Sequence, residues 1–299
     1  MKSGFVALIG RPNAGKSTLL NRVVGEKIAI VSDKPQTTRN RIIGVRNYPD
    51  AQVVFVDTPG VHRPLHRLNV RMVDVALETL KEVDVVTAVV DATERPGGGD
   101  RFLMDLLGKI SRPRVLALNK IDRLAKETLL PLIERYAKEM AFADIVPVSA
   151  LSGDNVDRLE SVLLSHLPEG EPLYPADFLT DQPERFFVAE IVREQVLQHT
   201  RAELPFASAV LVDRFEEPAV PRGLLRLYCS IVVERESQKP IVVGKGGSMI
   251  KAIGTAARQE LERFFDTKVF LDLRVKVRSD WREDERVLDT LGLPRKARR

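Results

Sequence analysis

The segment GRPNAGKS at residues 10–17 constrains the fold of this chain more than any other part of its sequence. It follows the apolar run Phe5–Ile9 and opens a stretch whose apolar residues recur at helical spacing. This is the strand–loop–helix setting that a Walker A motif requires. Glycines let such a loop curl so that successive backbone amides point at phosphate oxygens, assisted by the dipole of the following helix. The sequence therefore predicts a phosphate-binding loop near the start of an α/β domain.

Two side chains of this loop have predicted roles beside a bound nucleotide. Lys16 should reach the β and γ phosphates as a point charge, and Ser17 should ligate magnesium. A chance glycine-rich turn is the alternative, and the flanking strand and helix patterns make it the weaker interpretation. The residues of this loop that we predict to contact the nucleotide are Gly10, Arg11, Pro12, Asn13, Ala14, Gly15, Lys16, Ser17 and Thr18.

Two further motifs follow apolar runs in the chain order that a guanine-nucleotide site needs. In DTPG, at residues 57–60, Asp57 can hold magnesium through water and the amide of Gly60 can bond the γ phosphate. In NKID, at residues 119–122, Asp122 can accept both N1–H and the exocyclic amine of guanine. Adenine offers no such pair of donors, so Asp122 favours GTP over ATP. The predicted contacts from these motifs are Asp57, Thr58, Pro59, Gly60, Asn119, Lys120 and Asp122.

A third, shorter match follows the last apolar run of this half of the chain. It consists of Ser149, Ala150 and Leu151, and the Ala150 amide could bond the guanine oxygen. Three residues alone are a weak signal, and their order after the other motifs is what supports the interpretation.

The polar stretch KPQTTRNR at residues 34–41 is typical of a mobile switch loop. One threonine in it should complete magnesium coordination when the γ phosphate is present, but spacing alone does not separate Thr37 from Thr38. For either residue, a solvated loop hydroxyl is the alternative.

Val61 directly follows Gly60, in the region where Ras-like enzymes carry a water-orienting glutamine. A valine cannot orient water, so we predict slow intrinsic hydrolysis that a partner or an ordered RNA accelerates. His62 and His66 lie nearby, and we interpret both as solvated loop residues rather than catalytic groups.

The order of apolar runs indicates two domains. Runs near residues 5–9, 53–56, 83–90, 115–118 and 145–148 are separated by stretches of helical length, which predicts an α/β domain with a largely parallel sheet. We place this domain at residues 1–167 and a proline-rich linker at 168–183. Residues 184–292 then follow the order α-β-β-α-β, with room for a further helix before residue 244, and a basic tail occupies 293–299.

The sequence VGKGGSMI at residues 243–250 could suggest a second phosphate site, but it lacks the four-residue gap before Gly-Lys. It fits the Gly-x-x-Gly loop of a KH domain, which clamps the backbone of about four nucleotides. Its glycines permit close approach to RNA and its lysines could neutralise phosphate charge; a plain strand-to-helix turn is the alternative. The predicted RNA contacts are Gly244, Lys245, Gly246, Gly247 and Lys251.

Composition adds little to the argument for RNA binding. The net charge of +4 equals the charge of four tail residues, so a local basic patch is needed instead. The single cysteine, Cys229, excludes an intrachain disulfide and a cysteine-based metal cage. The N-terminal apolar run is far shorter than a signal-peptide core, so we expect a cytoplasmic protein. The four tail residues are Arg295, Lys296, Arg298 and Arg299.

With GRPNAGKSTLLN, QTTR, DTPG, NKID, VGKGGSMIKAIG and Trp281, the chain resembles the Era family of bacterial ribosome-assembly GTPases over nearly all residues to about Gly292. The resemblance implies an α/β P-loop GTPase domain followed by a smaller α+β type II KH domain. It implies a GTP-hydrolysing switch that binds the 3′ region of small-subunit ribosomal RNA and assists maturation of the small ribosomal subunit. It favours Thr38 over Thr37 as the magnesium ligand, and Lys16, Thr38 and Gly60 as the catalytic residues.

The resemblance carries further expectations about cofactors and partners. GTP or GDP with Mg²⁺ is implied, and Asn13 resembles a position used by potassium-activated GTPases, so K⁺ is an additional candidate. The family is reported as peripherally membrane-associated, so we expect contact with the inner face of the cell membrane, and we expect a monomer. Ala14 and the basic tail are minor departures from the family pattern.

Two rival interpretations differ in class. One is a GTPase acting in transfer-RNA modification or at a membrane, with the C-terminal region as a protein-interaction module; ribosomal and transfer RNA in a filter-binding test would discriminate. The other is an ATPase, which Asp122 disfavours.

Overall fold

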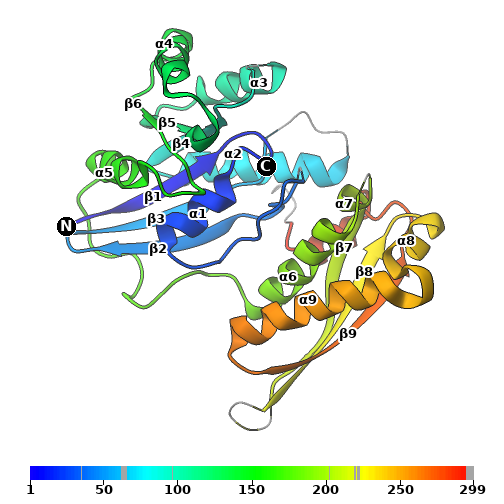
Figure 1. Ribbon diagram of the computed structural model, residues 1–299. Helices are drawn as coiled ribbons and strands as arrows, with labels where there is room; N and C mark the ends of the chain where they lie inside the picture. Colours follow the sequence, from blue (N-terminus) through cyan, green and yellow to red (C-terminus); the bar gives the residue numbers. More distant parts are fainter. Residues whose placement is uncertain are drawn as a thin grey trace. The chain divides into compact units, whose positions relative to one another are not determined.

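The computed structural model describes residues 1–34, 36–61, 66–95, 97–201, 203–218, 220 and 223–293. These residues form two compact units, one made largely of residues 1–181 and the other largely of residues 182–293 (Figure 1). His62 and residues 294–299 of the predicted basic tail lie outside the described residues. Within the described ranges, no helix combines the length and apolar character needed to cross a membrane.

The first unit is built on a six-stranded sheet with strand order β2-β3-β1-β4-β5-β6. Every neighbouring pair is parallel except β2 and β3, which are antiparallel. The prediction of a largely parallel sheet is confirmed, and β2 is an additional edge strand that the apolar runs did not indicate. The strands are β1 (Lys2–Ile9), β2 (Ile42–Tyr48), β3 (Ala51–Asp57), β4 (Val85–Asp91), β5 (Arg114–Asn119) and β6 (Asp144–Pro147).

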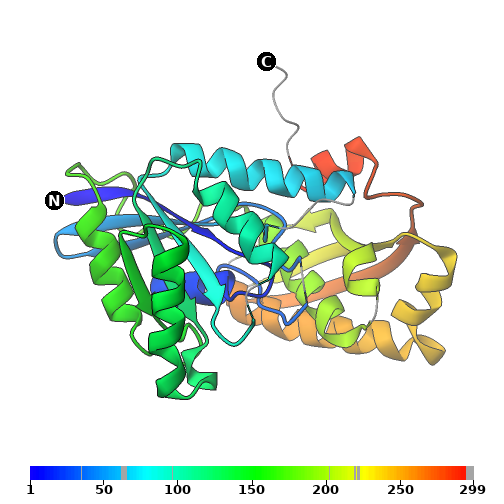
Figure 2. The same cartoon turned by 90° about the horizontal axis from the view of Figure 1, so that it is seen from above.

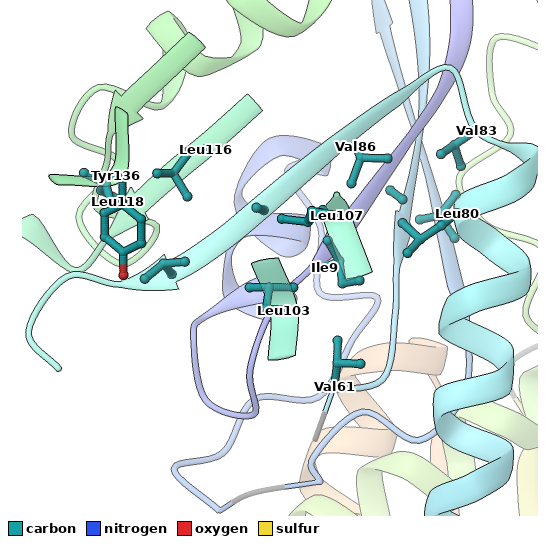
Figure 3. Packing of buried hydrophobic residues seen from close by; sticks show 14 of the residues in the cluster. Ile9, Val61, Leu80, Val83, Val86, Leu103, Leu107, Leu116, Leu118 and Tyr136 are labelled. Carbon is teal, nitrogen blue, oxygen red and sulfur yellow. The ribbon is translucent and has the colours of Figure 1, made fainter. Parts of the chain in front are cut away.

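Helices cover both faces of this sheet (Figures 1 and 2). On one face, side chains of α2, α3 and α4 pack with alternate strand residues into one core that includes Ile9, Leu80, Leu107 and Tyr136 (Figure 3). Burial of both sheet faces explains why the parallel strands are continuous apolar runs. The helices are α1 (Lys16–Val24), α2 (Arg67–Glu82), α3 (Gly98–Leu107), α4 (Leu129–Glu139) and α5 (Val156–His166).

The segment that we predict as the linker is anchored to the first unit. Gln52 of β3 is 1% exposed, and its Oε1 accepts hydrogen bonds from the amides of Leu173 and Tyr174 at 2.7 and 2.9 Å. A buried side-chain amide needs such partners, because an unbonded one is costly. The chain therefore runs along the outer strands as far as Asp181 before α6 begins at Glu184.

The second unit has a three-stranded sheet of order β7-β8-β9, in which β7 is antiparallel and β9 parallel to β8. Helices α6 and α9 pack on one face of it, where Val188, Val196, Ile253 and Leu261 join the core. The order of elements confirms the predicted α+β domain and its additional helix before residue 244. The elements are α6 (Glu184–His199), α7 (Leu204–Ala207), β7 (Ser208–Glu216), β8 (Leu224–Val233), α8 (Lys239–Val243), α9 (Ser248–Phe265), β9 (Lys268–Val277) and α10 (Glu285–Thr290).

Candidate nucleotide site and RNA-binding loop

The loop at residues 10–17 has a backbone path that glycine alone can follow at two points. Gly15 has φ of 95°, and a Cβ there would lie 2.1 Å from Asn119 Nδ2. A Cβ on Gly10 would lie 2.2 Å from the carbonyl oxygen of Val89. Both distances are far below any real contact, so the loop curls only because these residues lack side chains. The helix α1 begins at Lys16, so its amino end faces the interior of the curled loop.

Lys16 is buried inside this loop. Its side chain donates hydrogen bonds from Nζ to the carbonyl oxygens of Gly10 and Arg11 at 3.3 and 3.1 Å. Burial lowers the pKa of Lys16, and the nearby carboxylate of Asp57 opposes that shift. A buried ammonium bonded to two carbonyls is poorly compensated, so a site of this kind favours an anionic ligand.

Three side-chain oxygens converge beside Lys16. Ser17 Oγ lies 2.7 Å from both Thr38 Oγ1 and Asp57 Oδ2, and Thr38 Oγ1 lies 3.1 Å from Asp57 Oδ2. Asp57 is fully buried, and its Oδ1 has no hydrogen-bond partner among the described residues. Burial raises the pKa of Asp57, while Lys16, Ser17 and Thr38 oppose the shift.

This cluster fits a magnesium ion, because Mg²⁺ prefers oxygen ligands and is usually held by one or two carboxylates together with phosphate and water. A buried carboxylate with one unbonded oxygen is costly unless a cation neutralises it. Of the two candidate threonines, Thr38 is the one that joins Ser17 and Asp57. This position favours Thr38, and its role as a magnesium ligand stays a prediction.

The DTPG segment lies directly against the phosphate loop. Thr58 Oγ1 donates to the carbonyl oxygen of Leu8 at 2.8 Å, which ties the end of β3 to β1. A Cβ on Gly60 would lie 2.8 Å from the backbone nitrogen of Pro12, so the two loops touch through backbone. Both segments can therefore face the same phosphate.

The side chain of Val61 points into the hydrophobic core and not toward the phosphate loop. Its amide donates to the carbonyl oxygen of Gly10 at 3.0 Å, and its side chain is 1% exposed in the core with Ile9 and Leu103 (Figure 3). Position 61 is therefore part of the hydrophobic packing and not of the site that would hold the attacking water. His66 immediately precedes α2.

Asn119 connects the phosphate loop to the loop at residues 149–151. Its Nδ2 donates to the carbonyl oxygen of Ala14 at 2.8 Å, and its Oδ1 accepts from the amide of Ala150 at 2.9 Å. The Ala150 amide, which we predict to bond the guanine oxygen, is thus bonded to Asn119 in this structure. Sequence reasoning did not anticipate this brace, because its three members come from three distant segments.

The carboxylate of Asp122, which we predict to recognise the base, is exposed, and a hydrogen bond to one of its oxygens orients it. Ser149 Oγ donates to Asp122 Oδ1 at 2.6 Å. Lys120 has φ of 68°, and its Nζ lies 2.5 Å from Asp91 Oδ2 at the end of β4. The ion pair holds the lysine beside the loop that carries Asp122.

Arg11 and Leu151 are predicted to contact the nucleotide, and their side chains lie in different surroundings. The guanidinium of Arg11 turns to the start of α3, where Nη1 lies 2.8 Å from Glu94 Oε2 and 3.1 Å from Asp100 Oδ2. The side chain of Leu151 is 64% exposed. The sequence predicts nucleotide contacts at both positions, but it does not predict the direction of their side chains.

The second glycine loop joins two helices, α8 and α9, so the strand-to-helix alternative is wrong. Gly244, Gly246 and Gly247 have φ of 74°, 59° and 81°. A Cβ on Gly244 would lie 2.6 Å from the Met249 nitrogen, whereas one on Gly246 or Gly247 would meet nothing within 4 Å. The loop therefore leaves open space at its tip, directly before the amino end of an 18-residue helix.

Lys245 and Lys251 are exposed beside this tip, and neither forms an ion pair within the part of the chain that the structure describes. Open space at two glycines, two exposed lysines and a helix amino end are features that suit a nucleic-acid backbone. The predicted loop is thus accessible and positively charged.

Comparisons with known proteins cover both units. A family model described as 50S ribosome-binding GTPase matches residues 5–120, and one described as KH domain matches residues 211–282. The chain is 53% identical to GTPase Era of Geotalea uraniireducens over 291 residues, which is 97% of each chain. It is 48% identical to GTPase Era of Heliobacterium modesticaldum over 296 residues, 99% of this chain and 98% of the relative.

Two solved structures resemble the whole chain. One is Era in complex with MgGDPNP and nucleotides 1506–1542 of 16S ribosomal RNA, with a TM-score of 0.95 and 42% identity over 98% of this chain and 99% of that one. The other is an Aquifex aeolicus Era variant bound to GDP·AlF4⁻, with a TM-score of 0.93 and 42% identity over the same shares.

Proposed function

Because this chain belongs to the Era family of GTPases, we propose that its KH domain binds the 3′ region of small-subunit ribosomal RNA under the control of Mg–GTP in its first domain. The proposal of nucleotide binding rests on the cluster of Ser17, Thr38 and Asp57, which has one unbonded carboxylate oxygen and lies beside buried Lys16. The observation that carries the RNA half is the open glycine loop between α8 and α9. The biological role that follows is assembly of the small ribosomal subunit.

The residues of the first domain divide the work of phosphate binding. Lys16 exchanges its two carbonyl contacts for oxygens of the β and γ phosphates, which offer full negative charge. Ser17, Thr38 and Asp57 hold magnesium directly or through water. The ion neutralises charge that develops between the β and γ phosphates. The Gly60 amide donates to the γ phosphate, so loss of that phosphate removes a contact from this segment.

Thr38 makes the site sensitive to the nucleotide. It is contributed by the stretch at residues 34–41, whereas Ser17 and Asp57 belong to α1 and β3. A loop that supplies a ligand to the metal only when the γ phosphate is present is ordered by GTP and released when GDP is bound. We infer that this stretch reports the nucleotide state to the RNA-binding domain.

Val61→Gln is expected not to accelerate hydrolysis. Because position 61 points into the core with Ile9 and Leu103, a glutamine there reaches no water and buries an amide at a cost of about 1–3 kcal/mol. Single-turnover hydrolysis should stay within about threefold of wild type, which is a difference of less than 1 kcal/mol in barrier. Urea unfolding should show the lost stability, and Val61→Ile should show much less of it. A tenfold faster variant would overturn the assignment of Val61 to the core.

Gly246→Asp is expected to remove RNA binding while GTP hydrolysis persists. Space is open around Gly246, and aspartate tolerates its left-handed φ of 59° better than most residues, so the fold should survive. The added carboxylate faces RNA phosphate in a site that depends on electrostatics and close approach. Affinity for a 16S 3′-end oligonucleotide should fall at least about tenfold, or about 1.4 kcal/mol. RNA-dependent stimulation of hydrolysis should vanish with it.

The matched control is Gly246→Asn, which has the same size and backbone preference without the charge. It should retain most of the RNA affinity, and Gly247→Asp should reproduce the loss. A transfer RNA in the same assay tests the rival function. Unchanged ribosomal-RNA binding by Gly246→Asp would refute the KH assignment and favour the alternative that the C-terminal region is a protein-interaction module.

Other expectations, from the sequence or from the resemblance, stay predictions. These are potassium activation through Asn13, peripheral contact with the cell membrane, binding to the assembled small subunit, a cytoplasmic location and a monomeric state. The domain boundaries at 167 and 184 are likewise our proposal.

A further inference from the structure

The last turn of α1 carries Arg22, whose guanidinium reaches the loop at residues 149–151. Its Nε donates to the carbonyl oxygen of Ala150 at 3.2 Å, and its Nη2 donates to that of Leu151. Two donors of one planar group fix the orientation of both carbonyls, which a single point contact would not do.

This contact determines which way the loop amides face. The described chain contains no cis peptide bond, and in a trans peptide the C=O and the following N–H point in opposite directions. Binding of the Ala150 carbonyl to Arg22 therefore turns the Leu151 N–H away from α1. The Ala150 N–H is bonded to Asn119 Oδ1, and the Ser152 N–H is bonded to Ser149 Oγ at 3.1 Å. Of these three amides, that of Leu151 is left for a ligand.

The two carbonyls that Arg22 binds have no other donor among the described contacts, although the turn itself is closed by the bonds from the Ser149 amide to the Asp154 carbonyl and from the Gly153 amide to the Ser149 carbonyl. The Leu151 side chain is 64% exposed and makes no core packing. Ser149 and Asn119 anchor the preceding peptide units through their side chains. The carbonyls of residues 150 and 151 thus depend on Arg22 among the described contacts.

Arg22 also lines a cavity beside the loop at residues 149–151. A cavity of about 300 Å³ is lined by Arg22 and Val31 together with Thr18, Ala150 and Leu151, three residues predicted to contact the nucleotide. That volume is at the lower end of the range for small-molecule sites.

We propose that Arg22 is a positioning residue for guanine recognition, holding the loop at residues 149–151 so that it donates a hydrogen bond to the 6-oxo group of the base. This inference rests on the proposed nucleotide site and deepens it. Asp122 reads the N1–H and 2-amino edge of guanine, and Arg22 acts through the loop on the 6-oxo edge. The contact to the 6-oxo group can be tested by itself, because IDP keeps that group and a 2-aminopurine nucleotide lacks it.

The test measures dissociation constants of Arg22→Ala for GDP, IDP and the diphosphate of 2-aminopurine riboside. IDP keeps the 6-oxo group and N1–H and lacks the 2-amine, whereas the 2-aminopurine nucleotide keeps the amine and lacks both the 6-oxo group and N1–H. Only GDP and IDP can therefore respond through a contact to the 6-oxo group. GDP and IDP should weaken by the same factor, roughly fivefold for partly exposed hydrogen bonds. The 2-aminopurine nucleotide should change by less than about twofold on the same affinity scale.

Arg22→Lys keeps the charge but not the two-donor geometry, so it should weaken GDP and IDP by a smaller factor than Arg22→Ala does. It also replaces Arg22→Ala in the test if that variant does not fold. Arg135→Ala, on the exposed face of α4 where Arg135 pairs with Glu139, is the control that should change none of the three affinities. Equal weakening of all three ligands would show a general structural role and overturn the proposal, as would no weakening of any. If wild type itself fails to prefer GDP over the 2-aminopurine nucleotide, the proposed guanine site is what fails.

Discussion

Lys16→Ala is expected to reduce kcat/KM for GTP hydrolysis by on the order of a thousandfold, the range seen when a preorganised charge on a transferring phosphoryl group is removed. Lys16 lies inside the curled loop, where it donates hydrogen bonds to the carbonyl oxygens of Gly10 and Arg11. Because these acceptors are uncharged, we expect its strongest interaction to be with the phosphates of the nucleotide. The loss should appear in both nucleotide affinity and turnover.

The fold should not suffer, because burial already disfavours the charged form of Lys16 and lowers its pKa. Thermal unfolding without nucleotide should therefore occur at or slightly above the wild-type temperature, whereas added GDP should stabilise wild type and not the variant. The assignment of the phosphate loop fails if Lys16→Ala turns over GTP within tenfold of wild type.

Asp122→Asn is expected to exchange guanine for xanthine specificity. Ser149 Oγ donates to Asp122 Oδ1 at 2.6 Å, and an asparagine can satisfy that hydroxyl only with its Oδ1. Its amide NH2 group then faces the base, where it opposes the donors of guanine and complements the 2-oxo group of xanthine. A site built to pair with substrate donors rejects mismatched partners by factors of about 10⁴.

Because Asp122 is exposed, we expect a smaller loss of GTP affinity, on the order of a thousandfold, with a comparable gain for XTP. Displacement of a fluorescent guanine or xanthine nucleotide by each competitor measures both changes. Asp122→Ala is the matched control and should lose GTP without gaining XTP. Wild-type GTP affinity in Asp122→Asn would exclude Asp122 from base recognition.

The sequence predicts the residues of this site because they lie in short contiguous motifs. Lys16 and Ser17 follow Gly15 within one continuous loop motif, and Asp57 and Asn119 end strands that apolar runs reveal. The carboxyl ends of parallel strands meet at one edge of a sheet, so motifs far apart in the chain converge there. The KH unit was predictable for a similar reason, since its glycine loop and the period of α9 are local signals.

Contacts between distant segments were not predictable. Spacing in the sequence does not distinguish Thr37 from Thr38, whereas the structure places Thr38 beside Ser17 and Asp57. The bond from the Ala150 amide to Asn119 likewise depends on tertiary structure.

The linker prediction illustrates the same limit. Four prolines between residues 167 and 183 indicate irregular structure, but they do not show whether that structure packs. The deciding contact comes from Gln52, whose buried amide sits in a strand far away in sequence. Edge strand β2 has a related explanation: Ile42–Tyr48 follows directly on a polar loop and ends in charged and polar residues, so its apolar run is too short to stand out.

The measurement that tests the central claim most directly is the affinity of the wild-type chain for a fluorescent 16S 3′-end oligonucleotide in the presence of Mg²⁺ with either GDPNP or GDP. The account predicts tighter binding with GDPNP by at least about tenfold, or about 1.4 kcal/mol. It also predicts loss of that difference in Thr38→Ala, which removes the metal ligand that we propose for the switch stretch. Equal affinity in the two nucleotide states would contradict the proposal that Mg–GTP controls RNA binding by this protein.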